Sequence, residues 1–561
     1  MAFILALEML ALKIRKDGSI KGLPLPKAAN DNYDMFFKIV LYADDVTLFL
    51  NDMDELKNAL TLVTYFSKFS GLAMNRRKTE IMALGSNTNC NENDCGLSWT
   101  KKVKILGIYF SSSSSVSDIE ENWTSRVENI RRNIVKWFKR NCSIMGKICI
   151  VKSLLLSQII YPLQALVIPE KVLTEINTLF YRFIWKKRYS NTKAFEKVKR
   201  KVMCQDFSDG GLKMIDVIDM QSSCLLSWAA HLLNEKQERW KQIPLYMFSK
   251  FGEKLCCFHS NTTVKMFKGL GLFKNVFWKQ VFICWLKNKE MIQRAVGGEM
   301  LLSDTCLWNS RDIMYRGQTL FFSDWIKGGV CRVKDVIVNN EFLPFNDMQR
   351  KVGCKPTRLF EYRAICTAVK AAALRSANGI VYGFNGLKNL SKPCQFRKLM
   401  IKEKYVEPVI VKFWENKFDF RPGKEQWLMI NIVTTETRLR LLQWKILHNI
   451  YPTNILLYKI GIFSSNCCTY CENEIDYIEH FFYFCPKIVS IWKCVEDKVK
   501  CKYNINIKII LKEVFLGVFE NLQSSKAVIS YVNYLIVIAK MCVGIYRYGS
   551  PMDIVCIFER E

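Results

Sequence analysis

Apolar positions near the start of the chain predict a helix followed by a β-hairpin. Residues 3–12 are almost wholly apolar, a pattern typical of a helix that is buried on one face. Two runs rich in aromatic and aliphatic residues follow at 36–41 and 46–50, and they leave room only for a tight turn. The tip of the predicted hairpin therefore contains two adjacent acidic residues, Asp44 and Asp45.

Helical periodicity dominates the segments that follow. Apolar residues spaced by three and four positions predict a helix over 52–70, which Gly71 should end. A polar, basic turn then leads into a short strand near Met82, and an apolar run spans 103–110. From about 118 to 245 the pattern is helical. In the helix predicted over 52–70, the apolar positions are Leu56, Leu60, Val63, Phe66 and Phe69.

The helix expected around residues 127–140 has two contrasting faces. Its apolar stripe consists of Val127, Ile130, Ile134, Trp137 and Phe138. Its basic face consists of Arg131, Arg132, Lys136, Lys139 and Arg140. A charged helix face is usually just solvated. The same face could also follow the phosphate backbone of a nucleic acid.

The second half of the chain is less uniform. Residues 246–425 alternate between Trp/Phe-rich and Lys-rich segments and contain no recognisable motif. Helical periodicity resumes over 426–561, around a compact group of Cys and His residues. Together these patterns predict an α+β fold that is predominantly helical, with a few antiparallel strands near the N-terminus.

The charge balance favours a nucleic-acid partner. The chain of 561 residues has 82 Lys and Arg against 52 Asp and Glu, a net charge of +30 that is spread along its length. Distributed positive charge with many aromatic residues suits a continuous phosphate backbone. A membrane-surface protein would instead concentrate its basic residues in one cluster or on one amphipathic helix. We therefore expect no membrane partner.

Cysteine usage indicates a reducing compartment. The 22 cysteines are scattered through a large chain, and the N-terminus has neither a basic region nor a cleavage site of a secretory signal. The most apolar late stretch, 527–539, is broken by Lys540 and is expected to be too short to span a bilayer. These features predict a protein of the cytoplasm or nucleus that is not secreted and has no transmembrane segment.

The paired aspartates at the hairpin tip are the first candidate site. Two neighbouring carboxylates repel each other unless a cation lies on them. Because side chains alternate across a strand, Asp44 and Asp45 can point in different directions, one of them toward a groove. A divalent metal would relieve the repulsion and support phosphoryl transfer. The alternative is an ordinary surface turn.

A Cys/His cluster near the C-terminus is the second candidate site. Its members are Cys468, Cys471, His480 and Cys485, in the spacing Cys-(x2)-Cys-(x8)-His-(x4)-Cys. Three thiolates and one neutral imidazole suit tetrahedral zinc. Cys467 could compete for the metal, although its spacing is less favourable, and Cys494 lies just outside the cluster. The alternative is a set of buried structural cysteines.

The order of motifs behind the hairpin carries a family resemblance. Y-A-D-D at 42–45 is followed by S-G-L-x-x-N-x-x-K-T at 70–79 and by K-I-L-G-I at 104–108. In this order and spacing they resemble the reverse transcriptases of non-LTR retrotransposons, the LINE class. That family has an [FY]-A-D-D hairpin, the same S-G-L segment and a [YF]-L-G-[IV] hairpin.

The resemblance implies an RNA-directed DNA polymerase that uses two-metal nucleotidyl transfer. Asp44 would hold catalytic magnesium, and Asp45 would support it. Lys78 would lie near the triphosphate of the incoming dNTP, unless it is an ordinary solvated lysine. Leu106 and Gly107 would form the primer grip, where a small residue lets the backbone approach the primer. RNA and DNA, as template and primer, would be the partners.

The resemblance extends downstream. Residues 145–155 and 209–214 resemble the helical thumb of the family, and 444–462 resemble the region before its C-terminal zinc knuckle. The knuckle would staple a small local fold and help to hold nucleic acid. The expected domains are a partial reverse-transcriptase palm at 1–115, a helical thumb-like region at 116–245, a helix-rich connecting region at 246–425 and a C-terminal region with the zinc knuckle at 426–561.

The chain also departs from the family. Residues 3–12 resemble the segment just after the polymerase's motif B, and the fingers, the first catalytic aspartate and the template loop are not found before it. No endonuclease precedes it either. Two-metal catalysis needs carboxylates from both palm strands. We therefore expect a truncated polymerase that binds magnesium poorly and is catalytically impaired alone. The alternative is a non-catalytic RNA- or DNA-binding remnant that uses the basic thumb and the zinc knuckle.

Overall fold

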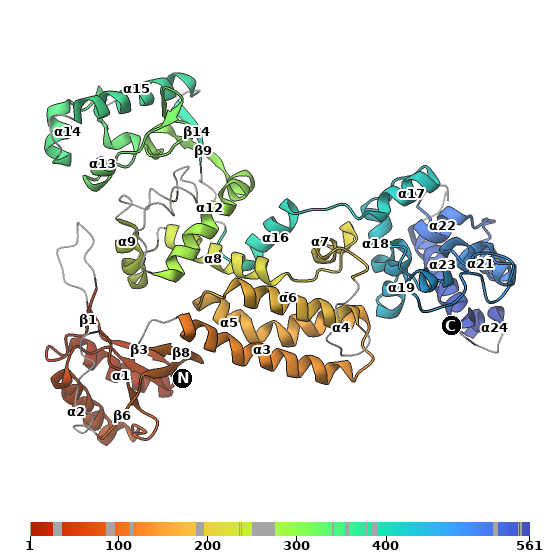
Figure 1. Ribbon diagram of the computed structural model, residues 1–561, viewed down its shortest axis with the longest axis horizontal. Coiled ribbons are helices and arrows are strands. Elements are labelled where there is room, and N and C mark those ends of the chain that lie inside the picture. Colours follow the sequence, from red (N-terminus) through yellow and green to blue (C-terminus); the bar gives the residue numbers. More distant parts are fainter. Residues whose placement is uncertain are drawn as a thin grey trace. The chain divides into compact units, whose positions relative to one another are not determined.

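The fold was examined in a computed structural model (Figure 1). The structure describes residues 2–25, 36–85, 96–112, 116–186, 196–234, 236, 238–249, 258, 275–338, 341–353, 358–376, 379–383, 390–519, 526–547, 549 and 553–560. The chain forms two compact units, each assembled from three separate segments. The first unit comprises Met1–Arg126, Tyr161–Glu170 and Met220–Leu399, and the second Val127–Ile160, Lys171–Asp219 and Met400–Glu561. The predicted order of four consecutive domains stays a prediction.

The first unit begins with the predicted helix and hairpin. Helix α1 (Ala2–Lys16) packs on strand β3 (Ile39–Tyr42), which pairs with β4 (Asp45–Leu48), and on helix α2 (Met53–Ser70). Their shared core is small and consists of Leu7, Leu10, Ala11, Ile14, Ile20, Ile39 and Ala59. One face of α1 is thus buried, as its sequence predicts.

Helix α2 has the predicted ends, and its buried face matches the predicted apolar stripe in part. The side chain of Asp52 caps its N-terminus by accepting the N–H of Glu55, and Gly71, with φ 71°, ends it. Ala59 and Glu55 are its buried residues. Val63 and Phe66 of the predicted stripe pack against the core, whereas Phe69 is 74% exposed. The buried Glu55 carboxylate accepts hydrogen bonds from the backbone N–H groups of residues 21, 22 and 51. These hydrogen bonds hold the segment after α1 and the segment before α2 at the start of helix α2.

Several two-stranded sheets complete this part of the first unit. They pair β1 (Leu23–Pro24) with β2 (Phe36–Phe37), β5 (Glu80–Ile81) with β6 (Ser98–Trp99), and β7 (Lys102–Ile105) with β8 (Ile108–Ser111). The β5–β6 pair is parallel and the other two are antiparallel. Of the serine run at 111–115, residues 113–115 lie outside the described residues.

The middle of the chain contains helices and unpredicted strands. Its helices are α8 (Val217–Leu233), α9 (Gln242–Ser249), α12 (Val276–Val296), α13 (Ser323–Lys327), α14 (Phe345–Val352), α15 (Leu359–Arg375) and α16 (Pro393–Glu403). Its strands pair β9 (Gly298–Leu301) with β14 (Ile380–Gly383), β10 (Met314–Tyr315) with β11 (Gln318–Thr319), and β12 (Ile337–Val338) with β13 (Glu341–Phe342). A separate core around the buried Trp308 and Trp325 holds the later part together.

The second unit is helical. Its earlier helices are the later part of α3 (Val116–Phe138), α4 (Ile144–Ile150), which continues into a π-helical turn over Val151–Leu155, the start of α5 (Ser157–Ala165), α6 (Glu170–Trp185) and α7 (Arg200–Cys204). Its later helices are α17 (Ile410–Phe418), α18 (Lys424–Val433), α19 (Thr437–Leu447), α20 (Asn454–Lys459), α21 (Val489–Tyr503), α22 (Leu511–Leu516), α23 (Lys526–Arg547) and α24 (Ile554–Arg560). The predominantly helical α+β fold is thus confirmed.

Helix α23 is the centre of the largest core. It contacts α18, α19, α21 and α24, and most of its residues are buried (Figure 1). The apolar stretch 527–539 is expected to be too short to span a bilayer, but the helix continues through Lys540 to Arg547. By length and composition α23 could therefore cross a membrane, and the bent helical segment Ile144–Leu155 with Ser157–Ala165 passes the same test. The burial of α23 inside the second unit is that of a core helix.

Candidate metal centre and acidic hairpin

The aspartate pair lies at the tip of a tight hairpin. Tyr42 pairs with Asp45 across the β3–β4 ladder, so only Ala43 and Asp44 form the turn. Ala43 adopts φ 51°, the left-handed conformation that two-residue hairpin turns require. The side chains of Asp44 and Asp45 are both exposed. The predicted hairpin is therefore present, and its carboxylates are open to solvent.

The hairpin contributes two neighbouring carboxylates to a candidate metal site. Within the described ranges, the Cys/His cluster is the one group of three or more Cys, His, Asp or Glu side chains whose ligand atoms converge. Asp44 and Asp45 thus form a pair of carboxylates without a third acidic partner among these residues. Magnesium needs near-octahedral oxygen coordination, usually through one or two carboxylates with waters and substrate phosphates.

The second motif folds into a turn organised by Asn75. Its carbonyl oxygen accepts the backbone N–H groups of Lys78 and Thr79, each at 3.1 Å, and also the Thr79 hydroxyl at 2.9 Å. The Lys78 side chain is exposed at this turn. The N-x-x-K-T spacing is thus explained by hydrogen bonds from positions 78 and 79 back to position 75.

The third motif forms the tight turn of the β7–β8 hairpin. Leu106 and Gly107 occupy the turn with φ 49° and 78°, and a Cβ on Gly107 would meet no atom within 4 Å. Arg126 of α3 donates from Nη2 to the Gly107 carbonyl at 2.7 Å. Asn122 exchanges two hydrogen bonds with the backbone of Tyr109. The first turns of α3 therefore fix this hairpin, a role that the sequence pattern did not reveal.

The basic face of α3 is largely open. The side chains of Arg132, Lys136, Lys139 and Arg140 are exposed. Arg140 also lies over the Trp137 ring at 4.7 Å. Arg131 forms an ion pair with Glu175 of α6. Most of the predicted basic face is thus accessible to a polyanion. Arg131 instead links helices α3 and α6 through its ion pair.

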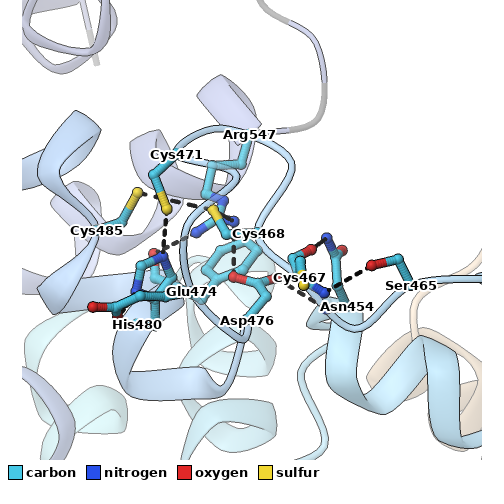
Figure 2. Close-up of polar contacts among 11 residues, drawn as sticks. Asn454, Ser465, Cys467, Cys468, Cys471, Glu474, Asp476, His480, Cys485 and Arg547 are labelled. Carbon is cyan, nitrogen blue, oxygen red and sulfur yellow. Dashed lines mark hydrogen bonds and ion pairs between the residues drawn. The ribbon is translucent and has the colours of Figure 1, made fainter.

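The four residues of the Cys/His cluster converge on one point. Figure 2 shows their side chains turned toward one another, and all four ligand atoms lie within 4.8 Å of each other. Cys471 Sγ is 3.3 Å from His480 Nε2, and Cys468 Sγ is 4.0 Å from Cys485 Sγ. The two cysteines of the Cys-(x2)-Cys pair come from a turn, and His480 opens a π-helical turn (His480–Phe484) that Cys485 directly follows.

These distances fit a tetrahedral zinc ion. Zinc bonds of about 2.3 Å to sulfur and about 2.0 Å to nitrogen place tetrahedral ligand atoms roughly 3.5–3.8 Å apart. His480 Nδ1 lies 3.0 Å from a Glu474 carboxylate oxygen, which leaves Nε2 facing the three sulfurs. A carboxylate on the second ring nitrogen is a common support for a metal-binding histidine. The cluster would hold zinc as a structural centre with four protein ligands.

The thiols of the cluster have different proton affinities. Burial raises the pKa of Cys485 to about 12. Burial also raises the pKa of Cys471, but hydrogen bonds to the backbone of Asn473 and Glu474 outweigh it, so that this pKa lies below its ordinary value. Because zinc binds thiolates, a cation at the centre would stabilise the deprotonated form of Cys485 in this buried place.

Cys467 is not part of the centre. Its side chain is exposed, and its sulfur lies near Asn466 Oδ1, away from the four ligand atoms (Figure 2). The alternative in which Cys467 replaces Cys468 is therefore excluded by the direction of its side chain. The described cysteines are all free, so the cluster is also not a pair of disulfides.

A glycine turn in the second unit fastens its early and late segments. The carbonyl oxygen of Gly210, which follows the turn Phe207–Asp209, accepts hydrogen bonds from Trp444 Nε1 at 2.9 Å and from His448 Nε2 at 2.8 Å. The Trp427 ring packs on Gly210 as well. Residues 209–214 belong to the predicted thumb-like region, and residues 444–448 belong to the predicted C-terminal region. The two segments therefore meet inside one unit.

Two family comparisons agree with these sites. Residues 24–110 match the sequence model of the family described as reverse transcriptase (RNA-dependent DNA polymerase). Residues 410–492 match the model described as zinc-binding in reverse transcriptase. The two matches support a reverse transcriptase. The second match and the Cys₃His cluster support zinc binding, and a reverse transcriptase segment implies binding of nucleic acid.

Sequence reasoning missed the residues that support these sites. Glu474 and Asp476 lie between the second and third zinc ligands, where a search for acidic residues inside the loop could have found them. Asn122 and Arg126 lie on the helix after the third motif, and Arg547 lies far from the cluster in sequence. No local pattern marks these three residues.

Proposed function

We propose that this chain carries the catalytic hairpin of a LINE-type RNA-directed DNA polymerase and is catalytically weak on its own. The observation that carries this proposal is the Y-A-D-D hairpin, with both carboxylates exposed at its tip, followed by two further motifs in family order. Asp44 holds a magnesium ion, and Asp45 supports it. Lys78 faces the departing pyrophosphate, and Leu106 and Gly107 carry the primer end.

The local geometry supports these assignments. Asp44 and Asp45 are solvent-exposed, as a site that receives a nucleotide requires. The space around Gly107 is open, which suits close approach of a nucleic-acid backbone. The weakness follows from the ligand count. Among the described residues the hairpin provides two neighbouring carboxylates, whereas two-metal catalysis uses ligands that bridge both ions.

Primer extension tests the proposal directly. The full chain is assayed with an RNA template, a DNA primer, dNTPs and magnesium, beside D44A and K78A. We expect slow, magnesium-dependent extension that D44A abolishes and K78A reduces by about 10²–10⁴-fold. Fast synthesis by the isolated chain would overturn the proposed impairment. Extension that D44A leaves unchanged would overturn the assignment of the hairpin.

The second candidate function is a nucleic-acid-binding remnant without polymerase activity. It is favoured by the exposed basic residues of α3, which occur with the zinc cluster in one unit. Binding would then rest on phosphate contacts and weaken steeply with salt. Asp44 would have no part in it.

Binding measured by fluorescence anisotropy tests the second candidate. K136E/K139E should weaken RNA and DNA binding and reduce the slope of log K against log salt by about 2. K201E/K412E changes the charge equally on other exposed sites of the same unit and serves as the control. D44A should bind as the unaltered chain does. Loss of binding in D44A, or no dependence on salt, would contradict this candidate.

A further inference from the structure

The last residue of α23 reaches the zinc cluster from outside the matched family region. The Arg547 side chain is 2% exposed, and its Nη2 lies 3.0 Å from Cys468 Sγ and 2.8 Å from Asp476 Oδ1. Its guanidinium carbon also lies over the Phe481 ring at 4.1 Å. Figure 2 shows the guanidinium directed at both Cys468 and Asp476. A buried arginine thus donates to one of the four proposed ligand atoms.

Asp476 fixes the direction of this arginine. Its carboxylate is wholly buried, with Oδ1 facing Arg547 and Oδ2 accepting the backbone N–H of Asn454 at 2.9 Å. A buried charge pair with hydrogen bonds at both ends has little freedom to rotate. Tyr470 adds a second tie, because its hydroxyl donates to the Tyr546 carbonyl at 2.8 Å. The Cys-(x2)-Cys turn is therefore held against the end of α23.

Charge explains what the guanidinium can do for the metal. Three thiolates and a divalent zinc ion leave one net negative charge in a largely buried place, and such a charge is costly without a partner. A cationic hydrogen bond to a thiolate lowers this cost and holds the sulfur in its binding position. Arg547 can donate to the sulfur and to Asp476 at the same time because its Nη2 carries two N–H bonds.

We propose that Arg547 is a positioning residue of the zinc centre. It orients and charge-balances the Cys468 thiolate from α23, and Asp476 holds it in place. This proposal rests on zinc binding by the cluster and not on polymerase activity. The metal affinity of the cluster therefore depends on a helix beyond residues 410–492, the range that matches the zinc-binding family.

Metal titration of the full chain tests the proposal. Reduced, metal-free protein is titrated with Co²⁺, whose absorption bands report tetrahedral thiolate coordination, and zinc affinity is then measured by competition with a chelator. We expect R547M to lower zinc affinity by about 10–100-fold. R547K should recover only part of this loss, because an ammonium is a compact and strongly hydrated charge that is costlier to bury than a guanidinium. R421M removes an exposed, ion-paired arginine of the same unit and should bind like the unaltered chain.

The absorption spectrum separates positioning from general stability. Loss of a hydrogen bond to the thiolate makes the sulfur a stronger electron donor, so the sulfur-to-cobalt band of R547M should move to longer wavelength. If R547M does not fold, D476N takes its place as the test variant. It keeps the shape of the Asp476 side chain and should show a smaller band shift in the same direction. Equal zinc affinity and an unshifted band in folded R547M or D476N would overturn the proposal, as would absence of Co²⁺ binding by the unaltered chain.

Discussion

His448 donates a hydrogen bond from Nε2 to the carbonyl oxygen of Gly210, with the two atoms 2.8 Å apart. The carbonyl is an acceptor only, so the ring proton must lie on Nε2. The His448 ring also packs beside the rings of Trp427 and Trp444. This buried contact joins the glycine turn after α7 to helix α19. It makes the second unit depend on the protonation state of one histidine.

The second unit should lose stability as the pH falls through the range in which histidine titrates. Burial lowers the pKa of His448 to about 4, and the hydrogen bond to Gly210 only partly opposes this. In the unfolded chain a histidine has a pKa of about 6.5, so between pH 6.5 and pH 4 the unfolded state binds the extra proton. The free energy of unfolding should therefore fall by up to about 3 kcal/mol across this range.

Thermal or urea unfolding of H448Q measures this effect. Zinc release also destabilises the unit at low pH, and it does so in both proteins, so the informative quantity is the difference between their pH profiles. H448Q should be less stable at pH 7 and should lose less stability toward pH 4. H231Q removes an exposed histidine and serves as the control. Parallel profiles for H448Q and the unaltered chain would rule out this role of His448.

Local patterns predicted the elements better than their packing. The hairpin at 39–48 and helix α2 follow from turn length, apolar spacing, the Asp52 cap and Gly71, all of which act within a few residues. Burial of Glu55 could not be predicted, because its hydrogen-bond donors come partly from residues 21 and 22. The same holds for Lys540, which in the sequence only ends the apolar stretch 527–539. Its buried partners, Gln443 and Val514, belong to other helices.

The sequence predicted those parts of the Cys/His site that lie close together along the chain. Metal ligands have a fixed spacing because a turn or a helix end must place them on one ion, and all four side chains of the converging cluster were found this way. Arg547 follows no such spacing, since its place beside Cys468 depends on how α23 packs in the core. The carboxylate pair of the hairpin was also found from the sequence. The hydrogen bond from Arg126 to the Gly107 carbonyl could be seen only in the folded structure.

The glycine after Gly210 should be among the least replaceable residues of the second unit. A Cβ on Gly211 would lie 2.0 Å from the carbonyl oxygen of Gln205, a backbone atom that cannot turn away. G211A should therefore lower the free energy of unfolding by about 1–3 kcal/mol or more. G146A, in helix α4, meets only side-chain atoms at 3.4 Å or beyond and should be neutral or stabilising. Urea unfolding that gives equal losses for the two variants would contradict this account.

Zinc content should distinguish the ligands from their neighbour. Freshly prepared, reduced protein should contain one equivalent of zinc, as measured by metal analysis. C471S should lower this ratio, because serine cannot supply a thiolate. C467S should leave it unchanged, since that side chain points away from the centre. E474Q removes the carboxylate beside His480 Nδ1 and should weaken zinc binding by about 10-fold or more. Zinc-free protein, or equal losses in C467S and C471S, would count against the ligand set.

Lys540 should make the second unit more stable as the pH rises above neutrality. Its ammonium group is wholly buried and donates to Gln443 Oε1 at 2.6 Å and to the Val514 carbonyl at 2.5 Å, and burial lowers its pKa to about 7. An unfolded lysine has a pKa of about 10.4, so between pH 7 and pH 10 the unfolded state binds one proton more than the native state. The free energy of unfolding should therefore rise with pH, by at most about 1.4 kcal/mol per pH unit.

Urea unfolding of K540M between pH 7 and pH 9 checks this expectation. Cysteine thiols titrate in the same range in both proteins, so the comparison again uses the difference between the two profiles. The unaltered chain should gain stability relative to K540M at each step, because methionine has no proton to lose. K526M changes an exposed lysine at the start of the same helix and should follow the unaltered chain. If K540M and K526M gave the same profile, Lys540 would be charged in the native state throughout this range, held by its two acceptors alone.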